Sequence, residues 1–207
     1  MVFKWNGKTT NLINLAVNSG RHQAIYEKVK NHVPDYDMDM VSKWEVAYLT
    51  MMSKLIDVFK QRHPGDAVSF MAATRDTVVL AVKLGEVKLL KLLFSHGATA
   101  QPSSYSFNTQ SYITSALDAA IPTRHIGSVT DDPLERNTMA CFYIIVKQLE
   151  EENVLWVLQT YFEDGLTPLQ RAITYENHKI IKVLLAKDIN VVSDVYVDRT
   201  KERASGT

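Results

Sequence analysis

The feature that most constrains the fold is the stretch 164–191, which the sequence pattern divides into a turn and two short helices. Asp164 and Gly165 indicate the turn, because glycine accepts the positive φ that a tight reversal needs. Thr167 is a favourable N-cap and Pro168 suits the first helical position, so the first helix is expected to begin there. Since two amphipathic helices of this size cannot bury their apolar faces alone, the stretch predicts a stack of similar units.

This stretch resembles one ankyrin repeat, a unit that combines a β-turn, the pattern Thr-Pro-Leu-His-x-Ala and a second helix ending in Leu-Leu. Residues 167–169 and 184–185 match that pattern, whereas Gln170, Glu176 and Asp188 stand where the family has His, Gly and Gly. The resemblance implies an all-α fold, namely a short ankyrin-like repeat solenoid of helix-turn-helix units with irregular insertions.

Other segments carry parts of the same pattern. The segment 76–98 is the second clearest match, and Gly85 is expected to end its first helix. The triplet Leu-Ala-Val around Ala16 recurs around Ala81, at an offset of 65 residues (81 − 16) that is close to two repeat lengths. A unit is therefore expected midway, around Ala47. A pair of large aliphatic residues follows eight residues after each of Ala47, Ala81 and Ala172.

The section between the two clearest repeats is predicted to be irregular. A polar stretch over 101–112 indicates an extended finger, and 115–120 resembles a degenerate first-helix pattern. The following loop, 122–133, is long for a compact domain, and loops of that length often carry function. Helices are expected over 134–151 and 154–162, and whether they form one repeat or belong to two stays open.

The whole chain, 1–207, is expected to form a single domain of about five or six degenerate units. The repeats are clearest over 76–98 and 164–191, and the irregular section covers 99–163. After Val191 the sequence becomes polar. Either the stack ends there in a short cap, or 1–207 is the N-terminal part of a longer protein.

The composition argues against several classes of protein. Lys plus Arg and Asp plus Glu are equal at 23 each, so no global charge draws the chain to nucleic acid or to an anionic membrane. No apolar run suits a signal peptide or a membrane span. The single cysteine rules out a disulfide framework within the chain and favours a reducing compartment. A cytoplasmic protein is expected, in its own cell or in the cytosol of a host cell.

No group of residues has the spacing of a catalytic or metal site. Cys141 could act as a thiol nucleophile with His125 and Asp131 or Asp132, but it lies in an apolar helical run, where a cysteine is usually core. The six histidines form no His-x-x-x-His pair, and the glycines form no phosphate-binding loop. No metal, cofactor or small-molecule substrate is expected, and the protein is expected not to be an enzyme.

In the ankyrin family partner proteins bind the concave face, which finger tips and first helices form. The resemblance implies that residues two and three positions after each aligned alanine are exposed on that face, together with Arg171. Aliphatic, aromatic and Arg side chains are typical anchors of protein interfaces. The candidate partner-binding residues are Leu49, Lys83, Leu84, Arg171, Thr174 and Tyr175, with Arg124 and His125 of the loop as a second set.

The predicted function is therefore a non-enzymatic interaction module that binds a partner protein through the concave face of the repeat stack. Divergent chains of this kind resemble those that intracellular bacteria and large DNA viruses deliver into host cells, which implies a role as an effector. Two alternatives stay open: a recognition domain of a larger enzyme, and a thiol-dependent enzyme that uses Cys141.

Overall fold

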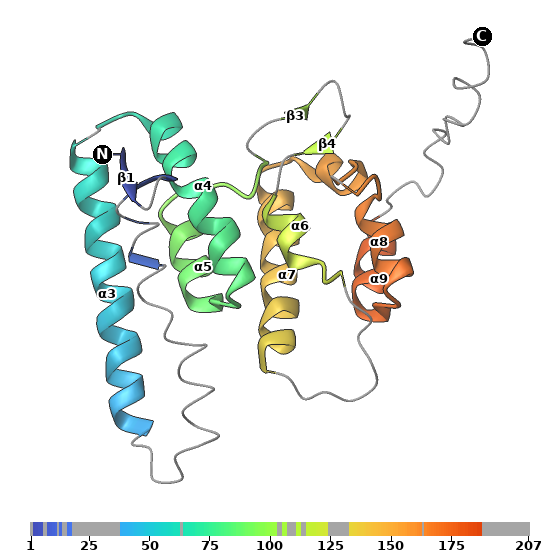
Figure 1. Ribbon diagram of the computed structural model, residues 1–207, viewed down its shortest axis with the longest axis horizontal. Coiled ribbons are helices and arrows are strands. Elements are labelled where there is room, and N and C mark those ends of the chain that lie inside the picture. The colour runs from blue at the N-terminus through green and yellow to red at the C-terminus, as the bar shows by residue number, and fades with distance from the viewer. Residues whose placement is uncertain are drawn as a thin grey trace.

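The computed structural model consists of helices packed side by side in a row, together with two small antiparallel β-hairpins (Figure 1). It describes residues 2–5, 8–11, 13, 16–17, 38–62, 64–102, 105–106, 111–112, 115–123, 133–162 and 164–187. Within these residues the fold is an all-α, ankyrin-like stack, as predicted from the sequence. The α-helices are α3 (Met38–Arg62), α4 (Ala67–Lys83), α5 (Val87–Ser95), α6 (Ala116–Ala120), α7 (Pro133–Glu151), α8 (Pro168–Thr174) and α9 (His178–Leu185).

The described helices form four layers, and in the last three both the first and the second helix are described. The second, third and fourth layers are α4 with α5, α6 with α7, and α8 with α9, in this order along the row (Figure 1). In the first layer α3 is the second helix, and the helical residues Ile13, Ala16 and Val17 occupy the place of the first. The described residues thus account for four layers, and the expected total of about five or six units stays a prediction.

One contact between layers recurs at equivalent positions. The imidazole Nε2 of His96, just after α5, lies 3.3 Å from Ser53 Oγ of α3, and its Nδ1 lies 3.7 Å from Asp57 Oδ1. Lys187 is the equivalent residue just after α9, 91 positions on (187 − 96), and its Nζ lies 2.6 Å from Glu150 Oε1 of α7. The contact of α3 with the residue after α5 is therefore equivalent to the contact of α7 with the residue after α9.

The aligned alanines test the predicted repeat positions. Ala81 and Ala172 are fully buried, and Ala16 packs against the core. Ala47 is exposed, because it lies inside α3, which is one continuous helix of 25 residues. The prediction of a helix-turn-helix unit around Ala47 is wrong. The third aligned position is instead Ala120 of α6, which is also fully buried.

The turn between the two helices of a layer requires a positive φ. Gly85 adopts φ 67° between α4 and α5, where the missing Cβ makes this conformation accessible. Glu176 takes the same place between α8 and α9, with φ 55°. A left-handed conformation costs a residue with a side chain about 1–2 kcal/mol. The last layer therefore carries backbone strain that the second layer avoids.

The first helices of the last two layers, α6 and α8, each have an N-cap residue whose side chain accepts a hydrogen bond from the backbone. Thr167 Oγ1 accepts from the N–H of Gln170 at 3.2 Å, and the Gln170 side chain accepts from the N–H of Thr167 at 2.9 Å. This reciprocal pair is a capping box, and it gives Gln170 a local role at the position where the family has His. Ser115 Oγ accepts from the N–H of Asp118 at 3.0 Å and caps α6. Both caps agree with the helix starts read from the sequence.

The irregular section is now resolved into elements. The strands β3 (Tyr105–Ser106) and β4 (Ser111–Tyr112) pair antiparallel, which agrees with the predicted finger. Helix α7 packs on α6, so the long helix belongs to the layer that α6 begins. The expected helix over 154–162 is a single 3-10 turn, η1 (Leu155–Gln159). The strands β1 (Val2–Trp5) and β2 (Lys8–Asn11), which the sequence did not indicate, form the second hairpin.

Candidate partner-binding surface

Four of the candidate partner-binding residues lie at or just after the C-terminal ends of the first helices. Lys83 at the end of α4 and Thr174 at the end of α8 are exposed. Leu84 and Tyr175, which follow them, are only partly buried, and Leu84 packs against the core. Only part of each of these two side chains is therefore accessible to a partner protein.

The third layer contributes a position that the sequence analysis missed. Because Ala120 is the aligned alanine of α6, the equivalent pair is Pro122, which is partly buried, and Thr123, which is exposed. The Ser-Ala-Leu-Asp-Ala-Ala pattern of 115–120 could have indicated this pair. Leu49, proposed through the misplaced unit, lies on α3 instead, where it is half-buried and packs against the core.

Four predicted residues lie outside the described residues. Arg124 and His125 belong to the part of the 122–133 loop that the structure does not describe, so their place in the candidate surface stays a prediction. The same holds for Asn18 and Ser19 of the first layer, which follow Ala16 at the equivalent positions.

Arg171 is buried, so the prediction that it lies exposed on the concave face is wrong. Its side chain forms an ion pair with Asp118 of α6, and its Nε and Nη2 lie 2.9 and 2.6 Å from Asp164 Oδ2 in the turn before α8. The guanidinium carbon also lies 4.1 Å from the centroid of the Phe162 ring, a cation–π distance. Arg171 therefore joins the last layer to the third.

A second polar contact holds the chain where it leaves α5. The carboxylate of Glu152, after α7, accepts from Thr99 Oγ1 at 2.7 Å and from the N–H of Ala100 at 3.0 Å. Gln148 Nε2 donates to the same carboxylate at 3.0 Å. The base of the segment that leads to β3 is thereby fixed to the end of α7.

The cysteine has the environment of a core residue. Cys141 is fully buried in α7, and burial raises the pKa of its thiol to about 12, with a further contribution from the carboxylate of Glu86. Burial likewise raises the pKa of the Tyr48 phenol well above its usual range. A neutral, enclosed thiol is a poor nucleophile, and the interpretation of Cys141 as core agrees with its burial.

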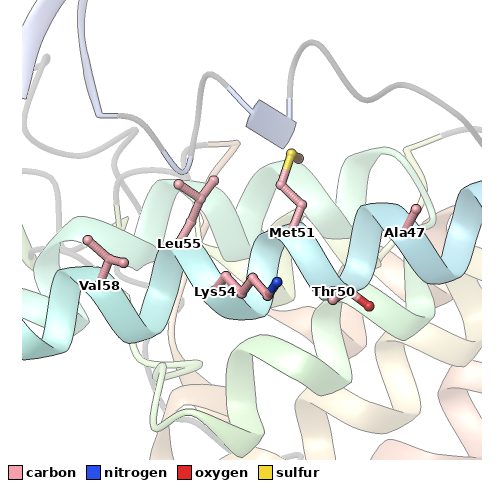
Figure 2. Close-up of a pocket in the computed structure, with 6 residues that line it drawn as sticks. All are labelled: Ala47, Thr50, Met51, Lys54, Leu55 and Val58. Carbon is pink, nitrogen blue, oxygen red and sulfur yellow. The ribbon is translucent and has the colours of Figure 1, made fainter.

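The described residues also define a shallow groove on the outer side of the first layer. Its volume is about 530 Å³, and Figure 2 shows that α3 supplies its labelled side chains. Among the described residues, no group of three or more His, Cys, Asp or Glu side chains could hold a metal ion, and no helix is long and apolar enough to span a membrane. The groove is lined by Ala47, Thr50, Met51, Lys54, Leu55 and Val58.

Comparison with known proteins assigns one part of the chain to a family. Residues 164–194 match the family model of the ankyrin repeat. This segment contains the turn at Asp164, the capped helix α8 and helix α9, which are the elements described above for the last layer. No curated protein and no solved structure matches the chain significantly. Ankyrin repeats are general protein–protein interaction modules, and the match places one such repeat in this segment of the chain.

Proposed function

We propose that this protein is a non-enzymatic module that binds a partner protein along the row of first-helix ends in consecutive layers. One observation carries the proposal: Lys83 and Thr174 are exposed at the ends of α4 and α8, and Thr123 is exposed three residues after the end of α6, whereas the aligned alanine before each of them is fully buried. The first helices thus combine a fixed inner side with an accessible end, which is the arrangement of a rigid binding scaffold.

The layers keep this row in register through buried contacts. Helix α6 packs on α4, and Arg171 joins α8 to α6 through Asp118. Because these contacts are buried and partly ionic, the spacing between the three exposed positions is preorganised. Preorganisation lowers the entropic cost of binding an extended partner surface. The half-buried edges of Leu84 and Tyr175 supply apolar area next to the polar positions.

The compartment is part of the proposal. A single buried cysteine suits a reducing cytosol. The cytosol of a host cell, with the protein acting as an effector, rests on the resemblance to delivered ankyrin proteins.

Site-specific photo-crosslinking tests the proposed row. A photoreactive amino acid replaces Lys83, Thr123 or Thr174 in the full chain, and in a matched control it replaces Lys91, which is exposed on α5. In cytosolic extract, the three row positions should capture the same partner, and an excess of unlabelled protein should compete with it. Capture of that partner from position 91 at equal yield, or no shared partner among the three row positions, would refute the proposal.

A further inference from the structure

One position distinguishes the last described layer from the three before it. The residue after the aligned alanine is Val17, Val82, Ile121 and Ile173 in the four layers, and its exposed fraction is 1%, 0%, 1% and 54%. The position is thus buried wherever the described chain supplies a further layer. It is exposed in the last layer, although the residue is just as apolar there.

The second helix of the last layer repeats the observation. Leu90 of α5 is fully buried, and helix α7 packs on α5. The equivalent residue of α9 is Ile181 (90 + 91), which is only partly buried, and Leu185 on the same side of α9 is exposed. Ile173, Ile181 and Leu185 therefore form an apolar surface, here named the C-terminal end face.

The opposite end of the row carries a second apolar surface. Glu45, Ser53 and Asp57 of α3 contact residues of the second layer. Trp44, Met51 and Val58 recur every seven residues, so they lie on one side of the helix, and at about 100° per residue that side is roughly opposite the three contact residues. All three are exposed, and Met51 and Val58 line the groove of Figure 2. We name this surface the N-terminal end face; it consists of Trp44, Met51, Leu55 and Val58.

We propose that the C-terminal end face of one molecule binds the N-terminal end face of a second copy of this chain. The internal contacts of the stack supply the argument. Helix α9 is equivalent to α5, and the long helix α7 covers α5. Helix α3 is the other long helix, and its outer side carries the exposed apolar residues Trp44, Met51 and Val58, next to Thr50 and Lys54. Helix α3 of a second copy would thus cover α9 as α7 covers α5.

The geometry determines the kind of assembly. The layers follow one another in a single row, so an inner layer contacts the previous layer with one side and the next layer with the other (Figure 1). A contact that continues this order joins two different surfaces, and such heterologous contacts add molecules head to tail. The surfaces are small, so the association is expected to be weak and to depend on concentration. Because they are mainly apolar, high salt should not weaken the association.

Sedimentation of the full chain tests the proposal with two double variants. Met51→Glu with Val58→Glu blocks the N-terminal end face, and Ile173→Glu with Leu185→Glu blocks the C-terminal end face. The matched control is Tyr143→Glu, which changes an exposed apolar residue on α7 in an inner layer. The wild type and the control should self-associate between about 10 and 500 µM, and each double variant should weaken self-association at least about tenfold.

Mixing the two double variants gives the decisive result. The first double variant keeps the C-terminal end face intact, and the second keeps the N-terminal end face intact. An equimolar mixture should therefore form a dimer of about twice the 23.4 kDa mass and no larger species. A wild type that stays monomeric throughout, or a mixture that stays monomeric, would overturn the proposal. Self-association of one double variant alone would instead show pairing of identical end faces. If a double variant loses helicity, the single variants Met51→Lys and Leu185→Lys replace it in the same mixture.

Discussion

Replacement of Arg171 by methionine should destabilise the protein by about 3 kcal/mol. The side chain is only 5% exposed, and it makes charged hydrogen bonds to two carboxylates, those of Asp118 and Asp164. Hydrogen bonds to charged groups contribute about 1.5–3 kcal/mol each. The two carboxylate side chains are 24% and 36% exposed, so water partly rehydrates them after the change, and the lower value applies to each. Methionine keeps an apolar side chain of similar length but also loses the guanidinium contact with the Phe162 ring, so about 3 kcal/mol is the part of the loss that comes from the two carboxylates.

Urea denaturation followed by far-UV circular dichroism measures this loss. The midpoint should fall with an unchanged slope, and a loss of about 3 kcal/mol corresponds to a decrease in melting temperature of roughly 6–12 °C. Lys147→Met is the matched control, because Lys147 pairs with Glu151 on the surface, where such pairs contribute less than about 1 kcal/mol. The double variant Arg171→Met, Asp118→Asn should lose less than the sum of the single changes, since the two residues are in contact. If Arg171→Met cost no more than Lys147→Met, the link between the third and fourth layers would have no energetic weight.

The remaining predictions concern a turn and a thiol. Glu176→Gly should stabilise the protein by roughly 0.5–1 kcal/mol, because the strain of a positive φ exceeds the extra entropy of glycine in the unfolded chain; an unchanged or lower melting temperature would contradict this. The Cys141 thiol should stay unreactive toward a disulfide reagent at pH 8 in the native protein and should react fully in denaturant, because it is buried and protonated; stoichiometric labelling of the native protein would disagree.

The last layer could be predicted from the sequence because its signals are local. A cap at Thr167, the following Pro168 and the turn at Glu176 lie within ten residues of one another, and each acts on the backbone of its neighbours. The family model matches the same segment. The burial of Cys141 followed from its apolar neighbours in the helix. Local patterns of this kind do not depend on what the rest of the chain does.

The first layer was misread because spacing alone does not distinguish one long helix from two short ones. Aliphatic pairs eight residues after an alanine occur in both arrangements. What distinguishes them is a residue that adopts a positive φ between the helices, such as Gly85 or Glu176. The sequence between Ala47 and Leu55 contains no Gly, Asn, Asp or Pro, so nothing interrupts the helix. The absence of a turn residue, which indicates one continuous helix, was therefore a stronger signal than the spacing of the aliphatic pairs.

The surface prediction failed at Arg171 for a different reason. An arginine next to the aligned alanine is exposed unless carboxylates from elsewhere surround it, and one of its two partners lies 53 positions earlier in the chain. No pattern within one repeat indicates such a partner. Charged residues near the aligned alanine can therefore be assigned to the surface only after the neighbouring layer is known.

The Glu152 carboxylate has a consequence for how the protein unfolds. It holds the backbone of Ala100, which follows α5, from a position just after α7. Release of the exit segment of the second layer therefore requires breaking its two hydrogen bonds to the Glu152 carboxylate, which the end of α7 holds in place. Hydrogen bonds to a charged group contribute about 1.5–3 kcal/mol each, so this one carboxylate couples the unfolding of two neighbouring layers and opposes fraying of the segment between them.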